Sequence, residues 1–143
     1  MNVNNLLQSK KSQIISVKPN TSVYDALVLM AEKNIGAVLV TTNDQLVGIL
    51  SERDYARKII LKGKTSKETK VEEIMTSQVL FVQPEQSVED CMAIMSDKHI
   101  RHLPVLEKGE LIGIISIGDV VNAVISEKEF AIKQLENYIS GTG

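Results

Sequence analysis

Apolar residues recur at helical spacing in two stretches that lie far apart in the chain. In each stretch they follow the pattern i, i+3, i+4 and i+7, which places them on one face of a helix. The positions are Val23, Ala26, Leu27 and Met30 in the first stretch, and Val88, Cys91, Met92 and Met95 in the second. Ser22 and Ser87 come directly before these stretches, and serine is a favoured helix N-cap. The pattern therefore predicts two amphipathic helices.

Short apolar runs on either side of these helices predict strands. One run precedes each helix and is closed by a proline, at 14–17 and at 79–82. Two runs separated by a polar turn follow each helix and predict β-hairpins, at 37–40 with 46–50 and at 103–106 with 111–115. A second helix follows each hairpin, with apolar positions at Ala56, Ile59 and Ile60, or at Val120, Val121, Val124 and Ile125. The predicted order is βαββα, and it occurs twice.

The two halves are copies of one unit. A shift of 65 residues places Pro19 on Pro84, Gly48 on Gly113 and Asp54 on Asp119 without a gap. About a third of a repeat of about 47 residues is identical at this offset, which chance seldom produces over such a span. A repeat of that length rarely buries enough surface to fold alone. We therefore expect an α+β fold in which two βαββα repeats pack sheet to sheet about a pseudo-twofold axis, with a cleft between them.

The segments outside the repeats complete the predicted organisation. We expect repeat 1 with a short helical lead-in at 1–62, a charged, solvated linker at 63–70, repeat 2 at 71–126 and a C-terminal helix at 127–143. The C-terminal helix carries Ala131, Ile132, Leu135, Tyr138 and Ile139 on one side, with Gly141 as its expected C-cap. Such a stripe has to pack on the module or on a partner chain, and a homodimer is the simplest partner.

Composition narrows the function classes. Apolar residues make up 43% of the chain, and the net charge of −2 gives no general attraction to polyanions. The one cysteine, Cys91, aligns with Ala26 and is expected in the core, and it allows neither an intrachain disulfide nor a multi-cysteine metal site. Neither a signal peptide nor a membrane span is predicted, so we expect a soluble, cytoplasmic protein.

The most informative motif closes each hairpin, as GILSERD at 48–54 and GIISIGD at 113–119. One interpretation is structural, since Ser with an acidic residue three positions later forms a capping box. The other is functional, because a helix N-terminus favours a phosphate and an Asp carboxylate accepts hydrogen bonds from a ribose diol. The two interpretations are compatible, and together they suggest a nucleotide.

The duplicated motif, the helices before it and the segments EEIMTSQVLFVQPEQSVEDCMAIM and IRHLPVLEKGELIGIISIGD resemble a pair of CBS (cystathionine beta-synthase) domains, a Bateman module. The resemblance covers about residues 14–126. It implies a homodimeric regulatory module that binds AMP, ADP, ATP, S-adenosylmethionine or NAD and senses energy or metabolite state for an effector protein that the sequence does not identify. It implies no catalytic cofactor.

The resemblance also implies the nucleotide-binding residues. The ribose-binding acids match Asp54 and Asp119, and the basic pair that meets phosphate matches Arg101 and His102. The complete predicted set is Ile15, Ile35, Gly36, Ala37, Ser51, Arg53, Asp54, Thr76, Val79, Leu80, Arg101, His102, Leu103, Pro104, Ser116, Gly118 and Asp119. The first copy has Gly36 and Ala37 in place of the basic pair, and the second has Gly118 in place of Arg53. We therefore expect the two half-sites to differ, and we favour the Ser116/Asp119 side as the tighter one.

Other functions have less support. No nucleophile elbow, Gly-rich phosphate loop or metal-ligand spacing occurs, and His99 with His102 does not match a helical metal pair, so we expect neither an enzyme nor a metal site. One alternative is a constitutive dimerisation or scaffold module whose motifs serve only as caps. Another is nucleic-acid binding through Arg57, Lys58 and the lysines of the linker.

Overall fold

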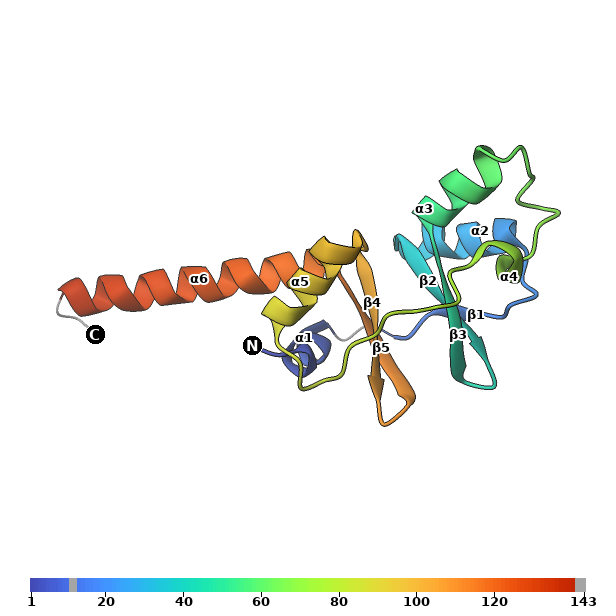
Figure 1. Cartoon of the computed structure of the whole chain (residues 1–143). Coiled ribbons are helices and arrows are strands. Elements are labelled where there is room, and N and C mark those ends of the chain that lie inside the picture. The colour runs from blue at the N-terminus through green and yellow to red at the C-terminus, as the bar shows by residue number, and fades with distance from the viewer. Residues whose placement is uncertain (11–12, 141–143) are drawn as a thin grey trace. The chain divides into compact units, whose positions relative to one another are not determined.

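The computed structural model describes residues 1–10 and 13–140 of the 143-residue chain. The fold is of the predicted mixed α+β type, with two sheets, helices around them and a helix at the C-terminal end (Figure 1). The chain divides into two compact units. Unit 1 comprises residues 1–12, 82–105 and 113–143, and unit 2 comprises residues 13–81 and 106–112.

Unit 2 contains most of the first repeat. Its elements are β1 (Ser16–Val17), α2 (Val23–Lys33), β2 (Ala37–Thr42), β3 (Gln45–Ser51), α3 (Glu52–Tyr55), the π-helix η1 (Ala56–Ile60) and α4 (Val71–Ile74). The sheet order is β1-β2-β3, with β1 parallel and β3 antiparallel to β2. The β2–β3 hairpin is therefore confirmed, whereas the strand predicted over 14–17 is limited to two residues.

The core of unit 2 forms where the predicted helical stripe meets the sheet. Val23, Ala26 and Met30 of α2 pack with Val38 and Val40 of β2 in one buried cluster. The cluster also contains Leu50, Ile59, Val71 and Ile74. The predicted N-cap is present, since the side chain of Ser22 accepts a hydrogen bond from the backbone of Asp25. Burial of one helical face and a capped first turn together account for α2.

Unit 1 contains most of the second repeat. Its helices are α1 (Val3–Lys10), α5 (Val88–Lys98) and α6 (Ile117–Ser140), and strands β4 (His102–Glu107) and β5 (Glu110–Ser116) form the second sheet. The short tip of this hairpin, residues 106–112, groups with unit 2. The strand predicted over 79–82 is reduced to a single parallel bridge between Val82 and Val105.

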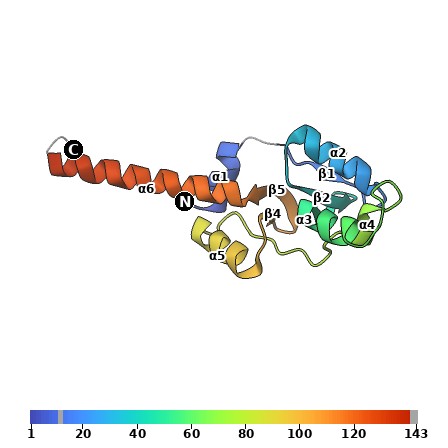
Figure 2. The same cartoon turned by 90° about the horizontal axis from the view of Figure 1, so that it is seen from above.

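Helix α6 is longer than the sequence pattern predicts. The helix expected after the second motif and the helix expected at the C-terminal end are one continuous helix of 24 residues. Figures 1 and 2 show that it runs well beyond α5 and α1, the helices of its own unit that it contacts. No glycine or proline occurs between residues 119 and 140, so nothing in the sequence ends the helix at residue 126. The C-cap predicted at Gly141 lies outside the described residues.

The two lead-in helices are exchanged between the units. Helix α1 precedes the first repeat in sequence but belongs to the unit built from the second, and α4 precedes the second repeat but belongs to the unit built from the first. In unit 1, the backbone N–H of Val3 donates to the carbonyl of Gln86 at 2.9 Å. In unit 2, the backbones of Ile49 and Thr76 exchange two hydrogen bonds of 3.0 and 2.9 Å. Each lead-in is therefore held by backbone hydrogen bonds in the unit built mainly from the other repeat.

The segment between the repeats is exposed at its lysines, but its backbone is held on α2. The N–H groups of Val23 and Tyr24 donate to the carbonyls of Thr69 and Ser66 at 2.8 and 2.9 Å. Thr69 is only 5% exposed, and its hydroxyl donates to the carbonyl of Thr65. These bonds satisfy N–H groups at the start of α2 that have no partner within the helix. The segment that we expected to be a solvated linker is thus mostly exposed, and its backbone is hydrogen-bonded to α2 of unit 2.

Candidate functional site

The first motif forms a capping box at the junction of β3 and α3. Ser51 is extended, with φ −113° and ψ 163°, and its hydroxyl accepts a hydrogen bond from the backbone N–H of Asp54 at 3.2 Å. The Asp54 carboxylate accepts in return from the backbone N–H of Ser51 at 3.0 Å. The structural interpretation of the motif is therefore confirmed for this copy.

The second motif repeats this geometry at the start of α6. The hydroxyl of Ser116 accepts from the backbone N–H of Asp119 at 3.2 Å, and the Asp119 carboxylate accepts from the N–H of Ser116 at 2.8 Å. Here the motif begins a helix of 24 residues, whereas the helical segment after the first motif, α3 followed by η1, ends at Ile60. A long helix presents the partial positive charge of its N-terminus to a bound anion. The second motif is therefore the better anion-binding candidate.

Both carboxylate oxygens of Asp54 already have partners. One oxygen accepts from the backbone and hydroxyl of Ser51 at 3.0 and 3.1 Å. The other lies 3.1 Å from Nζ of Lys58 and 3.4 Å from the hydroxyl of Thr76. The Asp54 side chain is only 12% exposed. A ribose diol would have to displace an existing partner in order to bind here.

Asp119 has a different environment. Its Oδ2 accepts from Ser116 and from Nζ of Lys10 at 2.9 Å, whereas its Oδ1 has no hydrogen bond among the described residues. Burial raises the pKa of this carboxyl, but hydrogen bonds from Lys10 and Ser116 more than offset it, so the pKa lies below its ordinary value. The side chain is 26% exposed. Asp119 is thus a charged carboxylate with one oxygen available.

The residues that precede β2 and β4 are tied to the two motifs. The carbonyl of Gly36 accepts from the backbone N–H of Glu52 at 3.0 Å, and the carbonyl of Arg101 accepts from that of Ile117 at 2.8 Å. These bonds bring two groups of predicted site residues to the helix starts, namely Ile35, Gly36 and Ala37 in unit 2, and Arg101, His102, Leu103 and Pro104 in unit 1. Leu103 and Pro104 are buried, so any contact that they make with a ligand would use the backbone.

The other predicted residues vary in their exposure. Ile15 and Val79 are half-buried, while Leu80 is 44% exposed. Arg53 and Gly118 are exposed next to their respective motifs. The side chain of Thr76 meets a motif acid directly, through its contact with Asp54. Their part in ligand binding stays a prediction.

Lys10 is a site residue that the sequence reasoning missed. Its ammonium donates to Asp119 and, at 2.8 Å, to the carbonyl of Ile114 in β5. The similarity of the segments 3–7 and 71–75 could have indicated this position for Lys10. Leu7 lies against Gly113 just as Met75 lies against Gly48. That equivalence places the end of α1 beside the second motif, as it places Thr76 beside the first.

Cys91 is fully buried, which confirms its predicted place in the core. Burial raises the pKa of its thiol to about 11, so the reactive thiolate is scarce at neutral pH. Within residues 1–10 and 13–140, no cluster of three or more His, Cys, Asp or Glu has the geometry to bind a metal ion. None of the helices described has the length and apolar character of a membrane span.

Each of the two copies has a helix, a β-hairpin and a capped G-h-h-S-x-x-D motif that leads into a second helix, so the module is duplicated. The CBS domain family model matches residues 9–61 and 71–126, and the chain belongs to this family. CBS pairs are generally regulatory and often bind ligands. The predicted family and the α+β fold class are therefore confirmed.

Relatives and solved structures agree with this assignment. The chain is 45% identical over 125 residues to the CBS domain-containing protein CBSX3, mitochondrial, of Arabidopsis thaliana, a match that covers 84% of this chain and 61% of that protein. It is 30% identical to the CBS domain-containing protein YhcV of Bacillus subtilis, covering 92% of this chain and 86% of the relative. A solved CBS-domain protein of Burkholderia ambifaria is 51% identical, with a TM-score of 0.85 and coverage of 88% and 95%.

Proposed function

We propose that the protein is a regulatory module that binds an adenine nucleotide (AMP, ADP, ATP or NAD) at the motif containing Ser116 and Asp119. The observation that carries this proposal is the carboxylate of Asp119 at the start of a long helix, whose Oδ1 has no hydrogen bond among the residues that the structure describes. A ribose diol donates hydrogen bonds to such an oxygen, as it does to the acid of dinucleotide folds.

The surroundings of Asp119 also suit a phosphate. The helix start offers N–H groups and a positive dipole, and the Lys10 ammonium lies 2.9 Å from the carboxylate. An ammonium has three N–H donors, and two of those on Lys10 are used by Asp119 and Ile114. Within residues 1–10 and 13–140 the third has no acceptor, so it can donate to an anion. Arg101 and His102, held at the same helix start by the Arg101 carbonyl, are the further basic candidates.

Isothermal titration calorimetry with AMP, ADP, ATP, NAD and S-adenosylmethionine tests the proposal. We expect at least one of the five to bind, and heat from none of them would refute a nucleotide sensor. Asp119→Ala should weaken the bound nucleotide by about 1–3 kcal/mol, because the ribose hydroxyls lose a charged partner.

Asp54→Ala is the matched control, because it removes the equivalent acid of the other motif. It should weaken binding less than Asp119→Ala, since both oxygens of Asp54 are already engaged. Equal losses in the two variants would contradict the preference for the second motif. Thermal unfolding of both variants checks that each still folds. Native mass spectrometry of the purified protein would identify a nucleotide that is retained from the cell.

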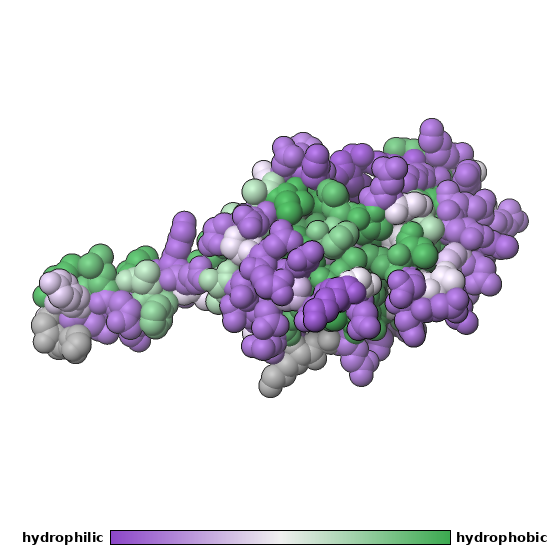
Figure 3. Space-filling view, turned by 60° about the horizontal axis from the view of Figure 1, so that its bottom comes forward, coloured by the Kyte–Doolittle hydropathy of each residue, from purple (hydrophilic) through white to green (hydrophobic). Residues whose placement is uncertain are grey.

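We also infer a homodimer that pairs through α6, which would serve equally the alternative of a constitutive scaffold. Ile125, Ile132, Leu135 and Ile139 are 49%, 57%, 58% and 75% exposed, and their spacing places them on one side of the helix. Figure 3 shows apolar side chains along the part of α6 that extends beyond its neighbours. Exposed apolar patches of this kind mark interaction sites.

Sedimentation equilibrium tests the dimer. The wild type should sediment at twice the chain mass of 15.8 kDa, and Leu135→Asp with Ile139→Asp should sediment as a monomer. The same mass for both proteins would contradict pairing through α6. A nucleotide that binds the two forms with different affinity would shift their balance, and an effector protein can detect that shift. Cytoplasmic location and the identity of the effector stay predictions.

A further inference from the structure

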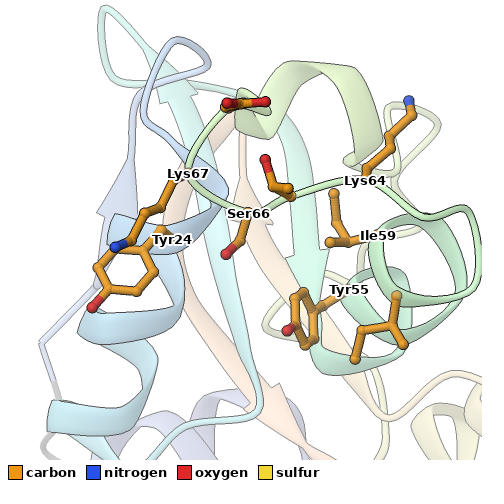
Figure 4. Close-up of a pocket in the computed structure, with 9 residues that line it drawn as sticks. Tyr24, Tyr55, Ile59, Lys64, Ser66 and Lys67 are labelled. Carbon is orange, nitrogen blue, oxygen red and sulfur yellow. The ribbon is translucent and has the colours of Figure 1, made fainter.

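Unit 2 has a hollow of about 440 Å³ that none of the predicted nucleotide-binding residues lines. Tyr24 of α2, Tyr55 of α3 and Ile59 of η1 form its apolar and aromatic part, while Lys64, Ser66 and Lys67 come from the segment after η1 (Figure 4). Its volume lies within the range of ligand and anchor pockets. In unit 1, the helix that corresponds to α3 and η1 is α6, which continues as one α-helix from Ile117 to Ser140.

The lining combines an apolar floor with a basic rim. Ile59 is only 2% exposed and closes the base, and Tyr24 keeps 43% of its surface exposed. Nζ of Lys67 lies 5.0 Å from the centroid of the Tyr24 ring (Figure 4). Tyrosine is enriched in protein interfaces because it offers a large, rigid surface with a polar end.

The backbone that carries this rim is already ordered. The N–H of Lys64 donates to the carbonyl of Ile59 at 3.0 Å, and the carbonyl of Ser66 accepts from Tyr24 at 2.9 Å. Thr69 is buried and anchors the end of the segment. A surface that is ordered before binding loses less conformational entropy on association.

A π-helix turn shapes the hollow. Helix η1 spans Ala56–Ile60, and the N–H of Leu61 donates to the carbonyl of Ala56, five residues back. Single π turns are rare and occur frequently at functional sites. Ile60, which lines the hollow, is 57% exposed, and the next residue, Leu61, is 76% exposed. Ile60 adds apolar surface to the rim.

The charge around the hollow is opposite to that of the chain. Residues 56–70 contain six basic residues and one acidic residue, which leaves ten basic and seventeen acidic residues in the rest of the protein. Lys58 is already paired with Asp54, so the basic residues that line the hollow are Lys64 and Lys67. A local basic surface on an acidic protein selects an acidic partner by charge complementarity.

We propose that this hollow and its basic rim are a docking surface for an acidic protein segment that carries one large apolar side chain. The apolar side chain packs on Ile59 between the two tyrosines, and carboxylates on the same segment pair with Lys64 and Lys67. Nucleic acid is a poorer match, because the exposed aliphatic surface of Ile60 offers nothing to a phosphate backbone. The docking surface does not depend on nucleotide binding at Asp119.

A displayed library of random short peptides provides the probe. The full chain is the bait, and the Lys64→Glu/Lys67→Glu variant is used for counter-selection. We expect the selected peptides to be acidic with one large apolar residue. Their Kd, measured by fluorescence anisotropy, should rise by about tenfold or more in the double variant. The control is Lys18→Glu/Lys33→Glu, which makes the same charge change at exposed positions elsewhere in unit 2 and should shift the Kd by less than about twofold.

Two further measurements complete the test. Ile60→Ser removes exposed apolar surface without changing charge, so its circular dichroism should match the wild type while its peptide affinity falls. The proposal is overturned if the selected peptides are not acidic, or if they bind the Lys64→Glu/Lys67→Glu variant as tightly as the wild type. It is also overturned if a single-stranded RNA binds the wild type more tightly than the peptides and loses binding in that same variant.

Discussion

The ion pair between Lys10 and Asp119 gives a quantitative prediction. The lysine ammonium lies 2.9 Å from Oδ2 of Asp119 and 2.8 Å from the carbonyl of Ile114, and the two side chains are 25% and 26% exposed. We predict that Lys10→Met lowers the free energy of unfolding by about 1–2 kcal/mol at neutral pH. A hydrogen bond to a charged group contributes about 1.5–3 kcal/mol, and partial exposure reduces this because water replaces part of the lost interaction. Methionine retains the apolar stem.

The pH dependence of this effect has a definite sign. Burial raises the pKa of Asp119, but the hydrogen bonds from Lys10 and Ser116 together lower it by more than burial raises it. In the folded protein the pKa of Asp119 therefore lies below its ordinary value of 3.8. The folded state therefore binds this proton less readily than the unfolded state. The resulting stabilisation is complete above about pH 5 and is lost as the pH falls through the folded-state pKa. The difference between wild type and Lys10→Met should shrink over the same range.

Urea unfolding followed by circular dichroism measures the effect at neutral pH and at the lowest pH where unfolding stays cooperative. Lys18→Met is the control, because Lys18 is exposed and its side chain has no ion pair among the described residues. If Lys10→Met lowers the free energy of unfolding by the same amount at both pH values, the electrostatic reasoning is refuted and the effect comes from packing. If it lowers that free energy at neutral pH no more than Lys18→Met does, the Lys10–Asp119 ion pair does not stabilise the protein.

Three further predictions concern close packing, the buried thiol and a helix cap. Gly48→Ala should destabilise the protein by about 1–3 kcal/mol in urea unfolding, because the new Cβ would lie 2.5 Å from Sδ of Met75 and 3.1 Å from the carbonyl oxygen of Thr76. Cys91 should react with a thiol reagent at mildly alkaline pH only as fast as the protein opens, and rapid labelling of the folded protein would contradict its burial. Ser22→Ala should lower the thermal midpoint through a loss of about 1 kcal/mol at the N-cap of α2, whereas an unchanged midpoint would contradict that role.

The sequence alone predicted the elements whose residues form a strong local pattern. The stripe from Val23 to Met30 and the serine caps determined α2 and α5, and the apolar runs beside polar turns determined both hairpins. The strands predicted over 14–17 and 79–82 were too long. Only two residues of the first pair with β2, and only Val82 of the second forms a β-bridge. Periodicity cannot show which backbone groups find a partner.

The candidate site was likewise predicted only where the interacting residues lie close together in the sequence. Both capping boxes follow from the spacing of Ser and Asp within each motif. The contact of Lys10 with Asp119 joins residues 109 positions apart, and no local pattern specifies such a distance. The ordered segment after η1 was missed for a similar reason, since its charged composition favours exposure while its backbone bonds to α2 depend on tertiary structure.

The exchange of α1 and α4 has a consequence for folding during synthesis on the ribosome. Helix α1 is synthesised before every element of unit 2, yet its partners in unit 1 include Gln86, Ile114 and Asp119. The elements of unit 2 up to α4 are complete before any of those partners is made, so unit 2 can assemble while α1 still lacks them. Closing so long a loop is slow compared with local contacts. A nascent chain arrested before residue 114 should therefore hold unit 2 nearly complete and leave α1 open to proteases.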